Sequence, residues 1–274
     1  MSNTDIYATG TSGTIGKYLG NTVKSINIDL SASASEFQQL NLTAGSTVVH
    51  LGAVVGESLV QENRDYASKV NIGGTKNLGE AALKSGCKKF IYVSTSHVYK
   101  GKNSPIIETD LLEPKTFYSE TKVGAETAIV ETLRQSEVEL TILRVFSILD
   151  WGMPPFTLGG AVERIVKGED IFIANGDDER DFLTPKTIAN LVLKLAVTSK
   201  LPPLMNICSG KVTSVFDAAS SMFKSAKSDN LSRIVAGHSA LPRIVGDNSL
   251  LKSLLPEQKY EWKLSPYHPK PSQG

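Results

Sequence analysis

The segment that decides the fold is Ile6-Tyr7-Ala8-Thr9-Gly10-Thr11-Ser12-Gly13-Thr14-Ile15-Gly16. A short apolar strand runs directly into a loop with a glycine at every third position. Such glycines allow a tight turn, let a pyrophosphate approach the backbone, and permit close packing of a helix on a strand. Ile15, Leu19 and Val23 predict that a helix follows, whose free N–H groups and positive dipole would hold phosphates. A merely flexible glycine loop is disfavoured, because a strand precedes this loop and a helical pattern follows it.

An acidic residue follows at the distance that a dinucleotide site requires. A second strand, predicted over 25–29, ends in Asp29, about 20 residues beyond Gly10, where a carboxylate would bond the adenosine ribose hydroxyls. Asp29 would repel a phosphate on that ribose, and no Lys or Arg lies between Asp29 and Arg64, so NAD is favoured over NADP. One alternative stays open. In it, Asp29-Leu30-Ser31 would be the acid–leucine sequence that lies near the adenine base in folds of this kind, and the usual second strand would be shortened.

Strands and helices then alternate along the chain. Apolar strands are predicted at 46–53, 88–93 and 139–148, with helices at 65–85 and 117–135. This alternation predicts an α/β fold, a doubly wound parallel-sheet (Rossmann) domain over residues 1–150. Residues 151–274 are expected to form a smaller, interleaved substrate-binding lobe, with helices at 160–167, 185–198, 212–227 and 248–255 and short strands near 170–174 and 204–208. We expect the polar tail from Glu257 to be loosely held, and His50, inside an apolar strand, to be a core histidine.

Composition excludes several classes of function. The 274 residues are 41% hydrophobic and 21% charged, with a formal net charge of +1, which gives no reason to propose nucleic acid or an anionic membrane as a partner. Cys87 and Cys208 match no metal or redox spacing, so two thiols in a reducing compartment and no metal site are expected. The start of the sequence has no basic-then-apolar leader, and no apolar run approaches the roughly 20 residues of a membrane span. We expect a soluble, cytoplasmic protein.

Tyr118 and Lys122 lie four residues apart on the helix predicted over 117–135, and therefore on one face. A neighbouring ammonium favours the phenolate, so Lys122 is expected to lower the pKa of Tyr118 towards the range where general acid–base catalysis works best. The pattern alone is weak, because an incidental lysine on an exposed helix face gives the same spacing.

Together these motifs resemble the extended short-chain dehydrogenase/reductase family, in its branch of NAD-dependent nucleotide-sugar epimerases, dehydratases and reductases. The resemblance runs from about residue 6 to about residue 255. It rests on the glycine loop and on seven later stretches: 48–53, Val70-Asn71 to Asn77, 90–99, Tyr118 to Lys122, 143–147, Gly176 to Phe182 and Asn206 to Gly210.

The resemblance implies Tyr118 as the proton-transferring phenol, Lys122 as its partner and ribose contact, and Thr95 as the residue that orients the reacting hydroxyl or ketone. It implies contacts to the cofactor and to the substrate. The cofactor contacts would come from Gly10, Ser12, Gly13, Thr14, Ile15, Gly16, Asp29, Leu51, Gly52, Ala53, Asn71, Val93, Tyr118 and Lys122. The substrate contacts would come from Ser96, His97, Ser147 and Arg180. Members commonly form a homodimer through a four-helix bundle that would include the Tyr118 helix.

Departures from the family pattern narrow the function. Dehydratases carry an acidic pair where this chain has Ser96 and His97, which disfavours dehydration. Ser147 stands where the family usually has asparagine, a position that helps to hold the nucleotide pyrophosphate, so this part of the site departs from the family pattern. The sequence predicts an NAD-dependent nucleotide-sugar epimerase with reversible hydride transfer at a sugar carbon, C4 in the family. The alternatives are an NAD(P)H-dependent ketoreductase or dehydrogenase of a 4-keto nucleotide sugar or small alcohol and, more remotely, a non-catalytic cofactor-sensing regulator.

Overall fold

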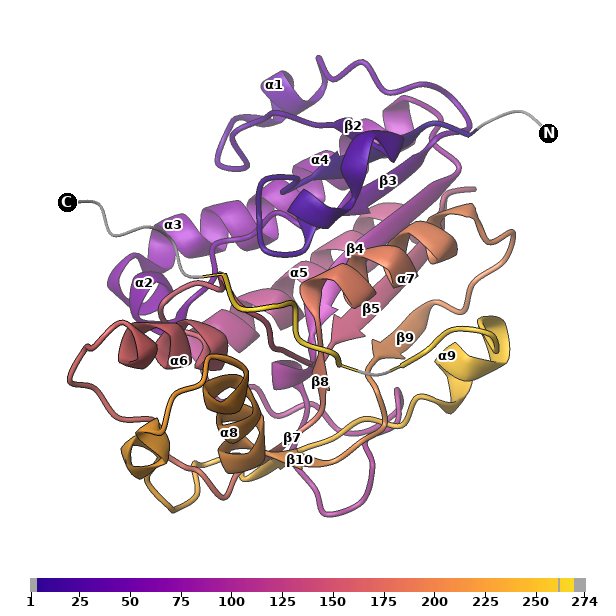
Figure 1. Cartoon of the computed structure of the whole chain (residues 1–274). Coiled ribbons are helices and arrows are strands. Elements are labelled where there is room, and N and C mark those ends of the chain that lie inside the picture. Colours follow the sequence, from indigo (N-terminus) through magenta and orange to yellow (C-terminus); the bar gives the residue numbers. More distant parts are fainter. Residues whose placement is uncertain (1–3, 261, 269–274) are drawn as a thin grey trace.

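A computed structural model describes residues 4–260 and 262–268 of the chain. Within this part, the central sheet has six parallel strands in the order β2-β1-β3-β4-β5-β9 (Figure 1). The strands are β1 (Ile6–Thr9), β2 (Lys24–Ser25), β3 (Thr47–His50), β4 (Lys89–Thr95), β5 (Glu139–Val145) and β9 (Leu204–Ile207). The doubly wound parallel α/β fold predicted from the sequence is confirmed. No helix in the described part of the chain is long and apolar enough to cross a membrane.

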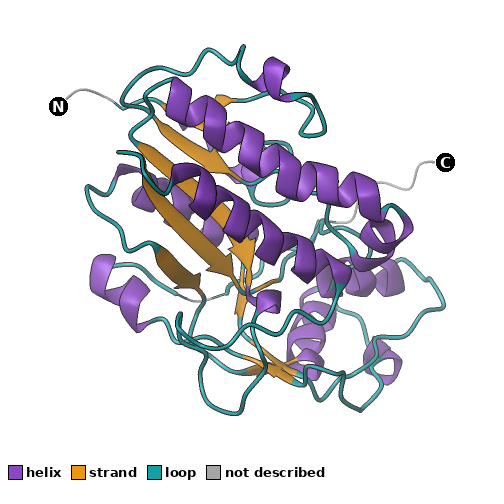
Figure 2. Cartoon of the chain, turned by 180° about the vertical axis from the view of Figure 1, so that it is seen from behind, coloured by secondary structure: helices purple, strands orange, loops and turns teal. Residues whose placement is uncertain are grey.

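Helices cover both faces of this sheet. On one face a helical stretch leads through α3 (Arg64–Ser68), the π-helical turn η3 (Lys69–Gly74) and α4 (Thr75–Lys84), and α5 (Phe117–Leu133) lies beside it (Figure 2). On the other face lies α7 (Pro185–Val197) (Figure 1). Each face has its own apolar core, because both sides of a buried parallel sheet must be covered.

The local sequence explains where these helices begin. Thr116 accepts a hydrogen bond from Ser119 N at 3.2 Å, and Ser119 Oγ accepts one from Thr116 N at 3.1 Å, which forms a capping box at the start of α5. At α7, Thr184 is the cap and Pro185 occupies the first turn, where its missing N–H costs nothing. The first of these caps places Tyr118 in the first turn of α5, at the carboxyl edge of the sheet.

Two early elements differ from the prediction. The helix expected after the glycine loop is only a pair of 3-10 turns, η1 (Gly16–Tyr18) and η2 (Gly20–Thr22). Gly20 has φ +64°, a left-handed conformation that interrupts a right-handed α-helix, and the poor helix formers Asn21, Thr22 and Val23 follow it. The predicted strand over 25–29 is also wrong, because β2 covers only Lys24–Ser25 and stops before Asp29. The short α1 (Ala34–Phe37) follows.

The second half supplies both the sheet and a smaller lobe. β9 and α7 belong to the central sheet layers, so the segment predicted near 204–208 is a strand of the main sheet rather than of the lobe. No strand forms at 170–174, where a single bridge pairs Ile173 with Ile234. Two short helical elements of the first half complete that part of the fold, α2 (Glu57–Glu62) and η4 (Ser96–Val98). The other elements of the second half are β6 (Ser147–Ile148), α6 (Leu158–Val166), β7 (Glu179–Arg180), β8 (Phe182–Leu183), β10 (Thr213–Ser214), α8 (Val215–Ser225), η5 (Asn230–Arg233), β11 (Arg243–Ile244) and α9 (Ser249–Leu254).

The described part of the tail is held more firmly than predicted. Tyr260 is buried, and its hydroxyl donates to the carbonyl oxygens of Leu255 at 2.6 Å and Leu251 at 3.2 Å. Ser265 bonds Asp150 through both its amide and its hydroxyl, each at 2.9 Å. The expectation of a loose tail from Glu257 is therefore wrong for these residues.

Candidate active site

The glycine loop forms a close-packed cradle at the carboxyl end of β1. Gly10 has φ +67°, and a Cβ there would lie 2.7 Å from Gly52 N, at the end of β3. A Cβ at Gly16 would overlap the Gly10 carbonyl oxygen. The amides of Ser12, Thr14 and Ile15 donate to no protein acceptor within the described residues. Neighbouring free amides on a glycine turn can bind phosphate oxygens, so the cradle fits the pyrophosphate of a dinucleotide.

Asp29 stands exposed, four residues beyond β2. Its Oδ1 accepts hydrogen bonds from the Ser31 amide at 2.8 Å and the Ser31 hydroxyl at 2.9 Å, and these bonds lower the pKa of the carboxyl. The next residue, Leu30, packs so closely on Gly52 and Gly74 that a Cβ at either glycine would collide with it. The acid–leucine step is thus fixed against the turn after β3, which is the alternative that the sequence left open.

His50 belongs to a buried hydrogen-bond chain and not to a metal site. Its Nε2 lies 3.0 Å from Thr75 Oγ1, which already donates to the Asn71 carbonyl at 2.6 Å, so Nε2 must be the donor. Nδ1 therefore accepts from Thr9 Oγ1 at 2.6 Å, and Thr9 Oγ1 in turn accepts from Gly52 N at 3.1 Å. Burial lowers the pKa of His50 to about 3. The neutral ring ties β1, β3 and the start of α4 together, in agreement with the predicted core histidine.

Asn71 sits in the π-helical turn η3, a type of helix distortion that often marks functional sites. Its Oδ1 accepts from Val54 N at 2.8 Å, and its Nδ2 donates to Val54 O at 3.1 Å and to Thr121 Oγ1 at 2.9 Å. The side chain is almost fully buried and has used its hydrogen-bonding groups within the protein. Asn71, predicted to contact the cofactor, therefore holds the turn after β3, with Leu51, Gly52 and Ala53, against α5.

Lys122 joins α5 to β4 and so sets the position of Tyr118. Its Nζ donates to Val93 O at 2.8 Å and lies 4.3 Å from the centroid of the Tyr92 ring. From Val93 to Thr95 the strand advances about 6.6 Å, and one turn of helix from Lys122 back to Tyr118 covers a similar distance, about 6 Å, towards the same edge. Thr95, Tyr118 and Lys122 are thus brought to one place at the carboxyl edge of the sheet.

The expected lowering of the Tyr118 pKa is wrong in this structure. Burial raises the pKa of Tyr118 to about 12, and burial lowers the pKa of Lys122 to about 7. The ammonium donates to Val93 O and lies over the Tyr92 ring, and no hydrogen bond joins it to the Tyr118 hydroxyl among the described residues. At neutral pH, Tyr118 therefore carries its proton and is a proton donor.

A buried carboxylate behind this pair was not found from the sequence. Glu126 forms a bidentate pair with Arg144, with Nη2 to Oε2 at 2.6 Å and Nε to Oε1 at 3.1 Å. Ser94 Oγ also donates to Glu126 at 2.5 Å, and the charge of Glu126 raises the pKa of Lys122 against the effect of burial. Glu126 follows Lys122 by one helical turn, a spacing that could have suggested the contact.

The four predicted substrate residues have different surroundings. Ser96 is fully buried, so its position does not support the expected substrate contact. His97 is exposed; neighbouring protein atoms, and then the charge of Arg180, lower the pKa of its imidazole, which is neutral at pH 7. Ser147 pairs with Phe182 in the β6–β8 ladder, and Arg180 precedes Phe182 by two residues, so the lobe carries Arg180 towards Ser147 and His97.

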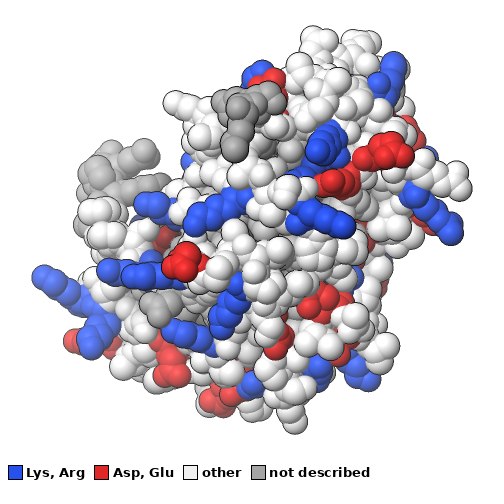
Figure 3. Space-filling model, turned by 90° about the vertical axis from the view of Figure 1, so that its right-hand side faces the viewer, with Lys and Arg blue, Asp and Glu red and all other residues white. Residues whose placement is uncertain are grey.

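A large hollow lies at the opposite edge of the sheet. It has a volume of about 820 Å³ and is lined by the amino ends of β1, β3 and β4, including Asp5, Lys24, Lys88 and Lys89. Lys and Arg side chains gather on this side of the molecule, interspersed with Asp and Glu (Figure 3). Ligands of open parallel sheets bind beyond the carboxyl ends of the strands, so this hollow is separate from the candidate active site.

Comparison with known proteins identifies the family. Residues 6–208 match the model of the family described as "NAD dependent epimerase/dehydratase family". The chain belongs to this family. The family predicted from the sequence is thereby confirmed, and the description of that family names NAD as its cofactor.

Relatives of this chain align with different fractions of its length. Rat "Methionine adenosyltransferase 2 subunit beta" is 32% identical over 108 residues, which span 35% of this chain and 32% of the relative. "UDP-glucose 4-epimerase 2" of Oryza sativa is 29% identical over 251 residues, 81% of this chain and 60% of the relative. The chain thus spans about a third of the rat protein's length.

Solved structures share the fold over nearly the whole chain. RMD from Pseudomonas aeruginosa complexed with NADPH has a TM-score of 0.82 at 20% identity and covers 94% of both chains. UDP-glucuronic acid 4-epimerase from Bacillus cereus in complex with UDP-glucuronic acid and NAD has a TM-score of 0.79 at 20% identity and covers 95% of both chains. At these identities the likeness concerns the fold.

Proposed function

We propose that this family member is an NAD-dependent nucleotide-sugar epimerase that transfers hydride reversibly at a hydroxyl-bearing sugar carbon, C4 in the first instance. The observation that carries the proposal is the convergence of Thr95, Tyr118 and Lys122 at the carboxyl edge of the sheet, fixed by the 2.8 Å bond from Lys122 to Val93 O. The amides of the glycine loop lie at the same edge. This substrate class is supported by the rice relative, which is named for UDP-glucose, and by the Bacillus cereus structure, which is a complex with UDP-glucuronic acid.

The residues have separable roles in this chemistry. When bound, NAD supplies the carbon that takes up and returns the hydride. Thr95 Oγ1 would orient the reacting oxygen, while Tyr118 donates its proton to a ketone oxygen or takes the proton of an alcohol. Because burial holds the pKa of Tyr118 near 12, proton donation is the favoured direction; proton removal requires Lys122 to carry its charge. Ser12, Thr14 and Ile15 would hold the pyrophosphate, and Asp29 the adenosine ribose.

The test is conversion of a nucleotide sugar without added coenzyme. We expect the purified chain to convert UDP-glucose or UDP-glucuronic acid to its C4 epimer, followed by proton NMR, and to release NAD on denaturation, detected by mass spectrometry. Tyr118→Phe should retain NAD and lose conversion by at least about a hundredfold. Turnover that consumes NADPH in proportion to product would reject the epimerase.

A ketoreductase that uses free coenzyme is the second candidate, and one observation favours it. Arg180 is already paired with Asp178 at 2.8 Å, so the lobe offers less free positive charge to a diphosphate than an unpaired arginine would. Oxidation of NAD(P)H by a 4-keto nucleotide sugar or a smaller ketone would identify this activity. The rat relative is named as a subunit of another enzyme, so a non-catalytic regulator is a third candidate. It would be supported if the purified chain bound NAD but converted no nucleotide sugar, and if Tyr118→Phe bound NAD as the wild type does.

We also propose a homodimer built on the outer surface of α4 and α5. A groove of about 480 Å³ runs between these helices, and Leu83 and Val130 are 41% and 45% exposed on them. Light scattering coupled to size-exclusion chromatography should give twice the mass of one chain. Val130→Glu should reduce the mass to that of one chain, whereas a monomeric wild type would exclude the dimer.

A further inference from the structure

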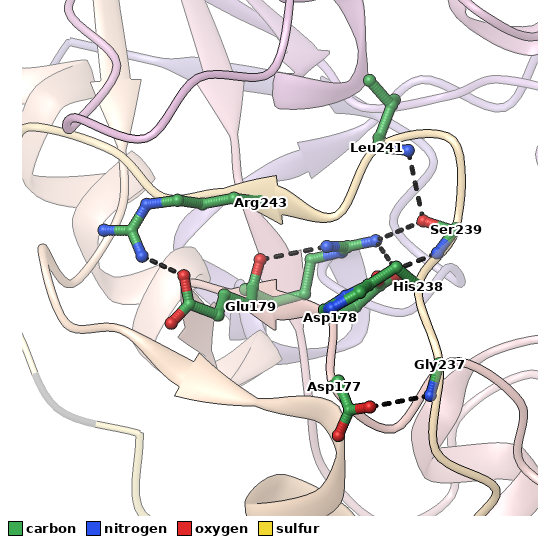
Figure 4. A network of polar contacts seen from close by, with 9 residues as sticks. Asp177, Asp178, Glu179, Gly237, His238, Ser239, Leu241 and Arg243 are labelled. Carbon is green, nitrogen blue, oxygen red and sulfur yellow. Dashed lines mark hydrogen bonds and ion pairs between the residues drawn. The ribbon is translucent and has the colours of Figure 1, made fainter.

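The guanidinium of Arg180 is held from three sides by its own lobe. Nη2 donates to Asp178 Oδ2 at 2.8 Å and to Ser239 Oγ at 3.4 Å, and Nη1 donates to Glu179 O at 3.0 Å. Asp178 also accepts the Ser239 amide at 2.9 Å, and its side chain is only 3% exposed. Figure 4 shows Asp178 facing Ser239 and His238 on the neighbouring loop 236–241. Arg180 is therefore clamped between β7 and this loop.

The clamp occupies the donors that a phosphate would need. A guanidinium grips an oxyanion bidentately through one of two edges, Nε with Nη2 or Nη1 with Nη2. Both edges include Nη2, and both hydrogens of Nη2 are directed at Asp178 and Ser239. Arg180 can therefore offer only single donors, Nε and the second hydrogen of Nη1, until Nη2 is released.

The carboxylates around Arg180 also oppose the binding of a phosphate. Asp177, Asp178 and Glu179 precede it directly, and Glu179 is itself paired with Arg243. Burial alone would raise the pKa of Asp178, but the bonds from Ser239 and the charge of Arg180 lower it, so the carboxylate is ionised at neutral pH. Each of these arginines is thus matched by a carboxylate. Asp177 adds a further negative charge and accepts the Gly237 amide at 2.8 Å.

We propose that Asp178 and Ser239 are specificity-determining residues that weaken the hold of Arg180 on the diphosphate part of a nucleotide substrate. This inference rests on the proposed function, because it takes Arg180 as the group that meets the diphosphate. The chain then selects its substrate mainly through the sugar. Nucleoside diphosphates that lack the sugar bind weakly, held by single hydrogen bonds and opposed by the neighbouring carboxylates.

The experiment measures binding of uridine diphosphate, not turnover. Isothermal titration calorimetry on the purified full chain, at one fixed salt concentration, would compare wild type with Asp178→Asn, Ser239→Ala and Asp177→Asn. Asp177→Asn is the matched control, because it removes the same charge one residue away without touching Arg180. Uridine, which has no phosphate, reports changes that do not involve the diphosphate.

Asp178→Asn should tighten the Kd for uridine diphosphate about tenfold, because it removes a repelling charge and weakens the hold on Nη2. Ser239→Ala, which changes no charge, should tighten it about two- to threefold, and Asp177→Asn should stay within about twofold of wild type. Uridine should bind all four proteins alike. Weaker binding by Asp178→Asn would mean that Asp178 orients Arg180 for the ligand, and would overturn the proposal.

Two further outcomes keep the tests separate. If Asp178→Asn does not fold, Ser239→Ala decides alone, and unchanged binding by that variant overturns the proposal. If neither wild type nor either clamp variant binds uridine diphosphate, the proposal is overturned as well. The proposed hydride chemistry is judged independently, by loss of conversion in Tyr118→Phe, so the two ideas can fail separately.

Discussion

Replacing Glu126 by glutamine should destabilise the fold and also lower the pKa of Lys122. The side chains of Arg144 and Glu126 are 6% and 8% exposed, and the pair is bidentate. Breaking such a buried pair by removing one partner typically costs about 3–5 kcal/mol, because the remaining charge is left uncompensated. The Glu126→Gln variant should therefore lose about that much free energy of unfolding, measured by urea denaturation followed by circular dichroism.

Two variants make this test specific. Glu126→Gln combined with Arg144→Met removes both charges and should recover most of the loss, since replacing a whole buried pair is often neutral or stabilising. Glu131→Gln removes an exposed carboxylate from the same helix and should change stability by no more than about 0.5 kcal/mol.

The Glu126→Gln variant should also change the pKa of Lys122. Glu126 raises the pKa of Lys122 against the effect of burial, so its removal should lower that pKa below about 7, as followed by carbon-13 NMR of the lysine Cε. A loss of less than about 1 kcal/mol, or a double variant no more stable than the single one, would refute the argument from the buried pair.

Three further predictions concern the cradle and the buried bases. Gly16→Ala should lose about 1–3 kcal/mol of stability and bind NAD poorly in a fluorescence titration, because its Cβ would overlap the Gly10 carbonyl oxygen. Gly73→Ala is the control, since a Cβ at Gly73 would meet nothing within 4 Å. Equal effects of the two substitutions would contradict the close packing of the glycine loop. Burial lowers the pKa of Lys122 to about 7 in the folded chain, so between pH 7 and about pH 10.4 the unfolded chain binds more protons than the folded one. The free energy of unfolding of the wild type, measured by urea denaturation, should therefore rise with pH relative to that of Lys122→Met. A difference between the two proteins that stays constant with pH would count against the burial of the ammonium. His50 should keep the NMR signals of a neutral Nε2–H ring down to about pH 5, whereas protonation near its ordinary pKa would disprove the buried chain from Thr9 to Thr75.

The parallel sheet and the Tyr118 helix followed from sequence because their signals are long and local. Continuous apolar runs gave β3, β4 and β5, and the spacing of Tyr118 and Lys122 holds on any helix. The early elements were harder to predict. The helical pattern of Ile15, Leu19 and Val23 was overridden by the left-handed Gly20, and such a conformation leaves no periodic trace in the sequence.

The candidate site was predicted in its residues more than in its electrostatics. Thr95, Tyr118 and Lys122 are placed together, but the direction of the Tyr118 pKa depends on where the Lys122 ammonium points, and that is fixed by Val93 O and Tyr92. The Glu126–Arg144 pair and the clamp on Arg180 join residues 18 and 59 positions apart in the chain. Spacing rules do not reach such contacts, which depend on the tertiary fold.

The packing of the tail has a consequence for the order in which the protein can be completed during synthesis. The ring centroids of Trp262 and Phe182 lie 6.3 Å apart, and those of Tyr267 and Trp151 lie 4.4 Å apart with the two rings tilted at 49°. These residues leave the ribosome after every strand of the central sheet. The glycine loop, the Tyr118 helix and β9 can therefore assemble while translation continues, as amino-terminal parts generally do first. The aromatic surface around Trp151 and Phe182 stays uncovered until Trp262 and Tyr267 have emerged, and transiently exposed apolar surface of this kind is prone to aggregation.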